Sequence, residues 1–177
     1  MTREGWAEAH GRLEGQAVLV TGGSGFIGTN LVEAFLGRTD RVLNLDLSAP
    51  RISSHRAVWR RVDICDADAL RREVAAFRPD IVVHLAARTD LHGRDVADYA
   101  TNTEGVRNVT NAVAAAGSAN LEIYASSRLV FDIHHRPAED FDYHATTPYG
   151  QSKVVGERIV RALGDDRPWV IVRPTSI

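Results

Sequence analysis

The sequence is poor in the residue types that mark several classes of protein. A single cysteine, Cys65, excludes an intrachain disulfide framework and a cysteine zinc cluster. The 21 basic residues nearly balance the 23 acidic ones, so no excess of positive charge marks a nucleic-acid or anionic-membrane partner. No apolar run approaches the roughly 18–20 residues needed to span a bilayer. These absences favour a cytoplasmic protein with neither nucleic acid nor membrane as its partner.

What is present fits one globular domain. The chain has 177 residues, 44% of them hydrophobic and 25% charged, which is enough to bury a core. Its first fifteen residues carry charges throughout and lack the apolar stretch of a signal peptide. We therefore expect an N-terminal extension over residues 1–15 and a single domain over residues 16–177.

Short apolar runs alternate with longer stretches of helical periodicity along the chain. The predicted strands are 17–20, 41–45, 57–62, 81–85, 121–125 and 169–172, and the predicted helices are 26–36, 66–77, 96–116 and 148–163. Such alternation is typical of βαβ units, and it predicts an α/β fold with a doubly wound parallel sheet and helices on both faces. The least regular stretch, 131–147, is predicted to be a functional loop or lid.

Glycines cluster where the first predicted strand gives way to a helix. Gly22, Gly25 and Gly28 are spaced by three residues. The segment 23–28, in which Phe26 and Ile27 are the two residues before the last glycine, also fits the pattern G-x-G-x-x-G. A strand before and a helix after this loop are the context in which the pattern binds a dinucleotide. Glycine lets the backbone approach a pyrophosphate, which then lies at the positive end of the helix.

Asp46 follows the second predicted strand, 18 residues after Gly28. A carboxylate at this position can accept hydrogen bonds from both ribose hydroxyls of adenosine, and it repels a 2′-phosphate. This favours NAD over NADP. Arg51 is close enough in sequence to neutralise a phosphate, so the discrimination stays open at this point.

Tyr149 and Lys153, the only lysine in the chain, are four residues apart in a predicted helix and therefore share one face. An ammonium near a phenol stabilises the phenolate and lowers the tyrosine pKa from about 10, which suits general acid–base chemistry near neutral pH. With 4 tyrosines in 177 positions, chance alone would give this spacing about 2% of the time (4/177).

With these residues in place, the chain resembles the extended short-chain dehydrogenase/reductases, in particular the NAD-dependent epimerase/dehydratase family that acts on nucleotide sugars. The resemblance covers residues 15–177. The segment 21–28 resembles the cofactor loop of that family, and Pro148 to Lys153 resembles its tyrosine–lysine segment. Ser127 lies three residues before a valine, as the family's catalytic Ser or Thr does, and Arg173-Pro174 completes the set.

The resemblance implies a mechanism and a set of site residues. Tyr149 as phenolate would take the proton of a sugar hydroxyl while a hydride moves to the nicotinamide. Lys153 would hold the nicotinamide ribose, and Ser127 would hydrogen-bond the reacting oxygen. The keto sugar would take the hydride back on its other face, which is epimerisation, or would be released or reduced. The implied cofactor-binding residues are Gly22, Gly25, Phe26, Ile27, Gly28, Asp46, Asp63, Ile64, Leu85, Ala86, Ala87, Tyr149, Lys153 and Pro174.

Departures from the family pattern narrow the expected reaction. Dehydratases of the family carry acidic residues directly after the catalytic Ser or Thr, whereas this chain has Arg128 and Leu129 there. Neither can act as a general acid or base at neutral pH, so dehydration is disfavoured. The histidines of the irregular stretch have no zinc-motif spacing, and Ser127 lies in no G-x-S-x-G elbow, which disfavours a metal site and a hydrolase.

Family members continue past the sixth strand into a region that supplies most of the sugar-nucleotide pocket, whereas this chain ends at Ile177. The resemblance therefore implies that the C-terminal substrate domain is absent. An NAD-binding module, or a truncated remnant without turnover, is the alternative to an enzyme. The resemblance also implies a homodimer through the helices near 96–116 and 148–163, and Val154, Val155 and Ile159 are expected in that contact.

Overall fold

The computed structural model describes residues 13–132, 134–164 and 166–175, so most of the predicted N-terminal extension lies outside the described residues. Its six strands form one sheet in the order β3-β2-β1-β4-β5-β6, with every neighbouring pair parallel. The strands are β1 (Val18–Thr21), β2 (Val42–Asp46), β3 (Trp59–Arg61), β4 (Ile81–His84), β5 (Leu121–Ala125) and β6 (Trp169–Val172).

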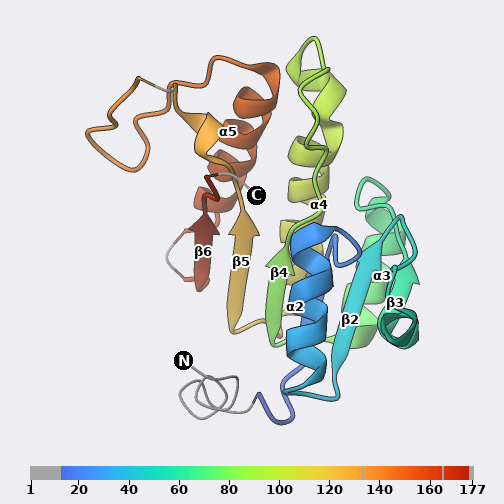
Figure 1. The fold of residues 1–177 in the computed structure, drawn as a ribbon. Helices are drawn as coiled ribbons and strands as arrows, with labels where there is room; N and C mark the ends of the chain where they lie inside the picture. Colours follow the sequence, from blue (N-terminus) through green and yellow to red (C-terminus); the bar gives the residue numbers. More distant parts are fainter. Residues whose placement is uncertain (1–12, 133, 165, 176–177) are drawn as a thin grey trace, which may run out of the picture.

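Helices cover both faces of this sheet, as predicted. The α-helices are α2 (Phe26–Leu36), α3 (Ala67–Phe77), α4 (Ala100–Ala116) and α5 (Pro148–Arg161), and the short 3-10 helices are η1 (Ser53–Val58), η2 (Val96–Tyr99) and η3 (Arg128–Val130). Figure 1 shows α3, α4 and α5 on one face and α2 on the other. In the described part of the chain, no helix is long and apolar enough to cross a membrane.

The predicted helix over 96–116 is two elements. Its first turn is the 3-10 helix η2, because the Asp95 side chain accepts hydrogen bonds from the amides of Ala97 and Asp98 and starts a tight turn there. The α-helix begins only at Ala100, after Tyr99. Likewise the predicted strand over 57–62 shrinks to three residues, because η1 occupies the chain up to Val58.

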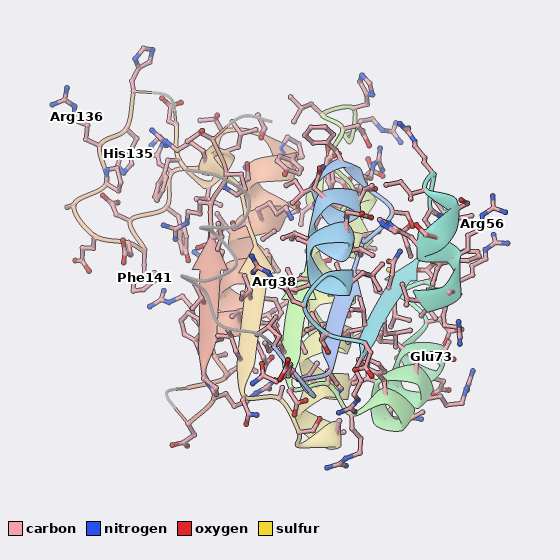
Figure 2. The ribbon with its side chains drawn as sticks, turned by 60° about the horizontal axis from the view of Figure 1, so that its bottom comes forward. Arg38, Arg56, Glu73, His135, Arg136 and Phe141 are labelled. Carbon is pink, nitrogen blue, oxygen red and sulfur yellow. The ribbon has the colours of Figure 1, made fainter. Side chains whose placement is uncertain are left out.

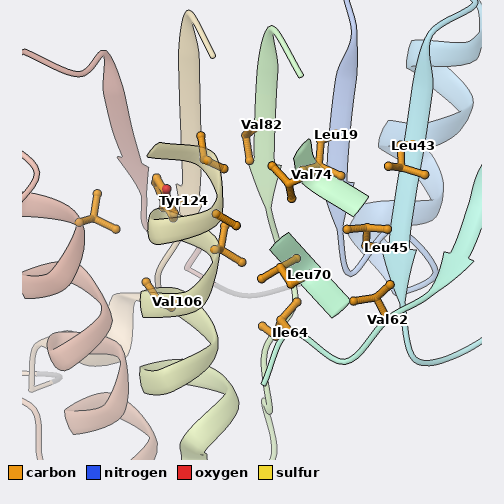
Figure 3. Packing of buried hydrophobic residues seen from close by; sticks show 14 residues of the cluster. Leu19, Leu43, Leu45, Val62, Ile64, Leu70, Val74, Val82, Val106 and Tyr124 are labelled. Carbon is orange, nitrogen blue, oxygen red and sulfur yellow. The ribbon is translucent and has the colours of Figure 1, made fainter. Parts of the chain in front are cut away.

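The core is divided by the sheet. Its larger part lies between the sheet and α3, α4 and α5, and includes Leu19, Leu45, Leu70, Val82 and Val106 (Figure 3). A smaller cluster lies under α2 and is built on the opposite faces of the same strands. Charged side chains such as those of Arg56, Glu73 and Arg136 point away from the body of the molecule (Figure 2).

The strand order creates one edge where a ligand can enter. β1 lies between β2 and β4, so the chain leaves β1 toward one side of the sheet and later returns on its other side. Because the strands are parallel, all their carboxyl ends lie along one edge, and connections diverge from it at the β1–β4 boundary. In sheets of this kind, ligands bind at that edge.

Candidate active-site cleft

A cleft of about 1140 Å³ opens at the carboxyl edge of the sheet. It runs from the loop after β1 to the start of α5 and the residues after β6. Every site residue predicted from the sequence lines it: Gly22, Gly25, Phe26, Ile27, Gly28, Asp46, Asp63, Ile64, Leu85, Ala86, Ala87, Ser127, Tyr149, Lys153 and Pro174. The fold therefore brings these separate sequence motifs together in one place.

The glycine loop fits tightly against its neighbours. Gly22 has a φ of +74°, in the left-handed region that glycine tolerates best, and a Cβ there would lie 2.6 Å from the amide nitrogen of Ala86. At Gly28 a Cβ would lie 2.2 Å from the Gly22 carbonyl oxygen and 2.5 Å from Gly23 Cα. Side chains at either position would push apart the backbone segments that form the floor of the cleft.

The N-terminus of α2 points its free amides at the cleft. Its N-cap, Gly25, makes no side-chain hydrogen bond, and its first turn holds no acidic residue. By contrast, Asp66 caps α3 and Thr147 caps α5 through their side chains. An uncapped helix start leaves backbone donors and a partial positive charge that suit an anion such as a diphosphate.

Asp46, at the end of β2, is held by the loop that it faces. Its Oδ2 accepts a hydrogen bond from the Ser24 amide at 3.0 Å, and its Oδ1 accepts one from the Ser48 amide at 2.8 Å. Each carboxylate oxygen has a further lone pair, so the group can still accept ribose hydroxyls. Arg51 is exposed and is not among the residues that line the cleft.

At the other end of the cleft, Ser127, Tyr149 and Lys153 meet. The Ser127 hydroxyl hydrogen-bonds the Tyr149 phenol, and it also accepts the Leu129 amide at 3.1 Å. The Lys153 ammonium donates to the Ala125 carbonyl at 3.1 Å, and its nitrogen lies 6.0 Å from the centroid of the Tyr149 ring. Tyr149 and Lys153 are both more than nine-tenths buried, with exposed fractions of 8% and 7%.

Burial sets the protonation of this centre. It lowers the pKa of Lys153 to about 8, against the opposing effect of the nearby Glu157 carboxylate. Burial also raises the pKa of Tyr149, and the hydrogen bond from Ser127 only partly opposes this. The expectation that Lys153 lowers the tyrosine pKa below its ordinary value is therefore wrong for this structure, because desolvation of the phenolate is the larger effect.

Sequence reasoning missed Glu157, which is 2% exposed and lies on α5 one turn after Lys153. Its carboxylate forms an ion pair with Arg173, and it accepts hydrogen bonds from the hydroxyl groups of Ser126 and Tyr143. The signal was present, because Tyr149, Lys153 and Glu157 are each four residues apart and so share a helix face.

Two other sequence expectations concern the outside of the molecule. Val154 is not available for a dimer contact, because it is buried against Val130 and Phe131.

In the irregular stretch, the His135 ring stacks on His144 with centroids 5.1 Å apart. Among the described residues, no group of three or more His, Cys, Asp or Glu side chains is placed to hold a metal ion.

Comparison with known proteins places this cleft in context. The profile of the NAD dependent epimerase/dehydratase family matches residues 18–177. A dTDP-glucose 4,6-dehydratase from Neisseria gonorrhoeae is 32% identical over 82% of this chain and 49% of its own length. An N-acetyl-alpha-D-glucosaminyl-diphospho-ditrans,octacis-undecaprenol 4-epimerase from Escherichia coli O157:H7 is 33% identical over 90% of this chain and 48% of its own length.

A solved structure shows the same fold with ligands. The Bordetella bronchiseptica enzyme WbmG, in complex with NAD and UDP, superimposes with a TM-score of 0.73 and 29% identity, over 93% of this chain and 54% of that one. The chain thus spans about half the length of the relatives that it matches. With the family profile covering nearly all of the sequence, the chain belongs to the NAD dependent epimerase/dehydratase family, whose cofactor is NAD.

Proposed function

We propose that this chain binds NAD along the cleft and carries the reacting centre of a nucleotide-sugar epimerase or reductase. One observation carries the proposal: a single cleft joins the uncapped glycine-rich start of α2 to Tyr149, Lys153 and Ser127. The glycine loop and the free amides of α2 fit a pyrophosphate, and Asp46 fits the adenosine ribose. Because the chain spans about half the length of its relatives, the proposal concerns the NAD-binding half of such an enzyme.

The geometry supports a proton-transfer role for Tyr149. In its phenolate form, Tyr149 accepts the proton of a sugar hydroxyl, and the Ser127 hydroxyl holds the same oxygen by a hydrogen bond. The Lys153 ammonium, which donates a hydrogen bond to the Ala125 carbonyl, is placed to bind the nicotinamide ribose. Bound NAD supplies the hydride acceptor for the sugar carbon.

The residues after Ser127 support epimerase or reductase chemistry over dehydration. Leu129 lines the cleft, and the Arg128 guanidinium lies 5.3 Å from the Phe131 ring centroid, over its face. Neither offers a carboxyl group that could move a proton at a neighbouring sugar carbon. The UDP bound to the WbmG enzyme supports a UDP-sugar as the substrate class. A homodimer through α4 and α5 is part of the same proposal.

Two measurements test the proposal on the purified chain. Fluorescence titration with NAD and NADP is expected to show tighter binding of NAD. Incubation of the NAD-loaded chain with UDP-sugars, followed by NADH absorbance and product analysis, then asks for hydride transfer, with Tyr149→Phe as the inactive control. Absence of NAD binding overturns the whole proposal. NAD binding without hydride transfer from any UDP-sugar favours the alternative, a cofactor-binding module without turnover.

A further inference from the structure

Glu157 is a buried carboxylate that is fully engaged by side chains from three other segments. Its Oε1 accepts the Ser126 hydroxyl and, at 2.7 Å, the Nε of Arg173. Its Oε2 accepts the Tyr143 hydroxyl at 2.8 Å and a second nitrogen of Arg173. A buried carboxylate stays ionised when a guanidinium and further donors replace its lost water. The end of β5, the irregular stretch 131–147 and the residues after β6 therefore all meet at the Glu157 carboxylate.

The partner at the strand end, Ser126, lies between two residues that serve the reacting centre. The carbonyl of Ala125 accepts the Lys153 ammonium, and the hydroxyl of Ser127 binds the Tyr149 phenol. Side chains alternate along extended backbone, so Ser126 is held from behind by Glu157 while Ser127 serves Tyr149. Fixing Ser126 thereby fixes the backbone that presents both neighbours.

A small cavity of about 20 Å³, large enough for one water, lies between Lys153 and Glu157. The titratable groups that line it from other elements are His84 of β4 and Tyr124 of β5. Burial and the Lys153 charge lower the pKa of His84 to about 3, and burial raises the pKa of Tyr124, so both are neutral. Tyr149, on the same helix, has a raised pKa as well. Among the described residues that line the cavity, Glu157 is the one anion.

We propose that Glu157 is a positioning residue of the reacting centre: its carboxylate favours the ammonium form of Lys153 across the cavity and holds Ser126 so that Ala125 and Ser127 meet Lys153 and Tyr149. The inference rests on the proposed function, because it gives Lys153 the role stated there. Glu157 touches neither cofactor nor substrate in this role. It acts through Lys153 and through the strand end.

Lys153 is the only lysine in the chain, so its pKa can be measured without assignment. Protein labelled with carbon-13 at the lysine ε-carbon is expected to give one lysine signal that titrates with pH in NMR spectra. In Glu157→Gln, which keeps the shape and removes the charge, the pKa of Lys153 is expected to fall by about one unit. A purely structural role predicts the opposite sign, because loosened packing admits water and raises the pKa toward the ordinary 10.5.

Glu122 provides a matched control. It is 1% exposed and forms an ion pair with Arg167, as Glu157 does with Arg173, but it does not line the cavity beside Lys153. Glu122→Gln is expected to destabilise the fold to a similar extent and to leave the Lys153 titration unchanged. If Glu157→Gln fails to fold, the double variant Glu157→Gln/Arg173→Gln removes both charges and leaves neither buried alone. It is expected to lower the pKa of Lys153 by less than Glu157→Gln does, because the positive charge of Arg173 is removed together with the carboxylate.

The outcomes separate this inference from the proposed function. A fall in the pKa of Lys153 in the Glu157 variants, with no change in Glu122→Gln, supports the positioning role. An unchanged or raised pKa overturns it, even if the chain binds NAD. Conversely, if the pKa of Lys153 falls in the Glu157 variants but the chain binds no NAD, the coupling between Glu157 and Lys153 stands. The absence of NAD binding then refutes the proposed function.

Discussion

The two ends of the cleft are built on opposite principles. The nucleotide end, from β1 to α2, uses backbone: glycines stand where a Cβ would clash, and the helix start carries no side-chain cap. The reacting end, between β5 and α5, uses buried polar side chains, with Lys153 and Glu157 both more than nine-tenths buried. At the nucleotide end, therefore, steric space limits which residues the fold tolerates, and at the reacting end the balance of buried charges does.

This contrast separates what each end costs the fold. Backbone amides at an exposed helix start can hydrogen-bond water, so the nucleotide end costs the fold little stability. At the reacting end, Lys153 is held in a place where its charge is disfavoured, as its lowered pKa shows. The nearby Glu157 carboxylate compensates part of that cost. Mutations should thus act through sterics at one end and through electrostatics at the other.

The largest effect is expected from Gly28→Ala. The new Cβ would meet backbone atoms at 2.2 and 2.5 Å, which a rotamer change cannot relieve. We expect a loss of about 3 kcal/mol or more in the free energy of unfolding, measured by urea denaturation, together with the loss of NAD binding. Gly37→Ala is the matched control, because its Cβ would lie 3.7 Å from the nearest atom. Equal stability of the two variants would contradict the steric account of the nucleotide end.

Tyr149→Phe should separate chemistry from binding. The phenol is the proposed general base, so hydride transfer from a UDP-sugar is expected to slow by at least ~10²-fold, while NAD affinity hardly changes. The rate is measured as NADH formation in single turnover, in a form of the enzyme that shows turnover. Tyr124→Phe serves as the control, because it removes a buried hydroxyl that bonds Glu122 outside the cleft. Near-normal turnover in Tyr149→Phe would remove the phenol from the mechanism.

Lys153→Met should stabilise the ligand-free chain while weakening NAD binding. The folded pKa of Lys153, about 8, lies below its ordinary 10.5, so the wild-type fold carries a penalty that is full below pH 8. The penalty disappears as the pH rises from 8 to 10.5. We therefore expect the variant to gain about 2 kcal/mol in free energy of unfolding near neutral pH, after allowance for the lost hydrogen bond, and less in alkali.

Urea denaturation of both proteins across this pH range checks the prediction. A methionine variant that is less stable than wild type near neutral pH would show that the lysine is not under electrostatic strain. A gain that stays constant into alkali would assign the stabilisation to apolar packing and not to the removal of the charge.

The smallest effect is expected at Asp46. Asp46→Asn removes the negative charge and keeps an acceptor oxygen for only one of the two amides, those of Ser24 and Ser48, that the carboxylate binds. We expect NAD affinity to fall about tenfold and the preference over NADP to shrink, in fluorescence titrations with both cofactors. Asp68→Asn, on the exposed face of α3 and paired with Arg71, is the control. Unaltered selectivity in Asp46→Asn would place the adenosine ribose elsewhere.

Local pattern predicted the elements best where one helix or strand face decides the structure. The helix over 26–36 and the strands over 121–125 and 169–172 match the observed bounds. The pattern failed where polar side chains compete for backbone donors, as Asp95 does at the start of η2. It also placed Val154 on the surface, because periodicity does not show that η3 and Phe131 pack over that side of α5.

The sequence by itself determined the α/β fold, the glycine loop, the tyrosine–lysine pair and the family, because each depends on residues that are close together in the chain. Only the tertiary structure decided the charge balance of the reacting centre. The partners of Glu157 lie 14, 16 and 31 residues away in sequence, and they meet it only when β5, the irregular loop and the end of β6 converge on α5. The direction of each pKa shift depends on that convergence, since burial and charge act through space and not along the chain.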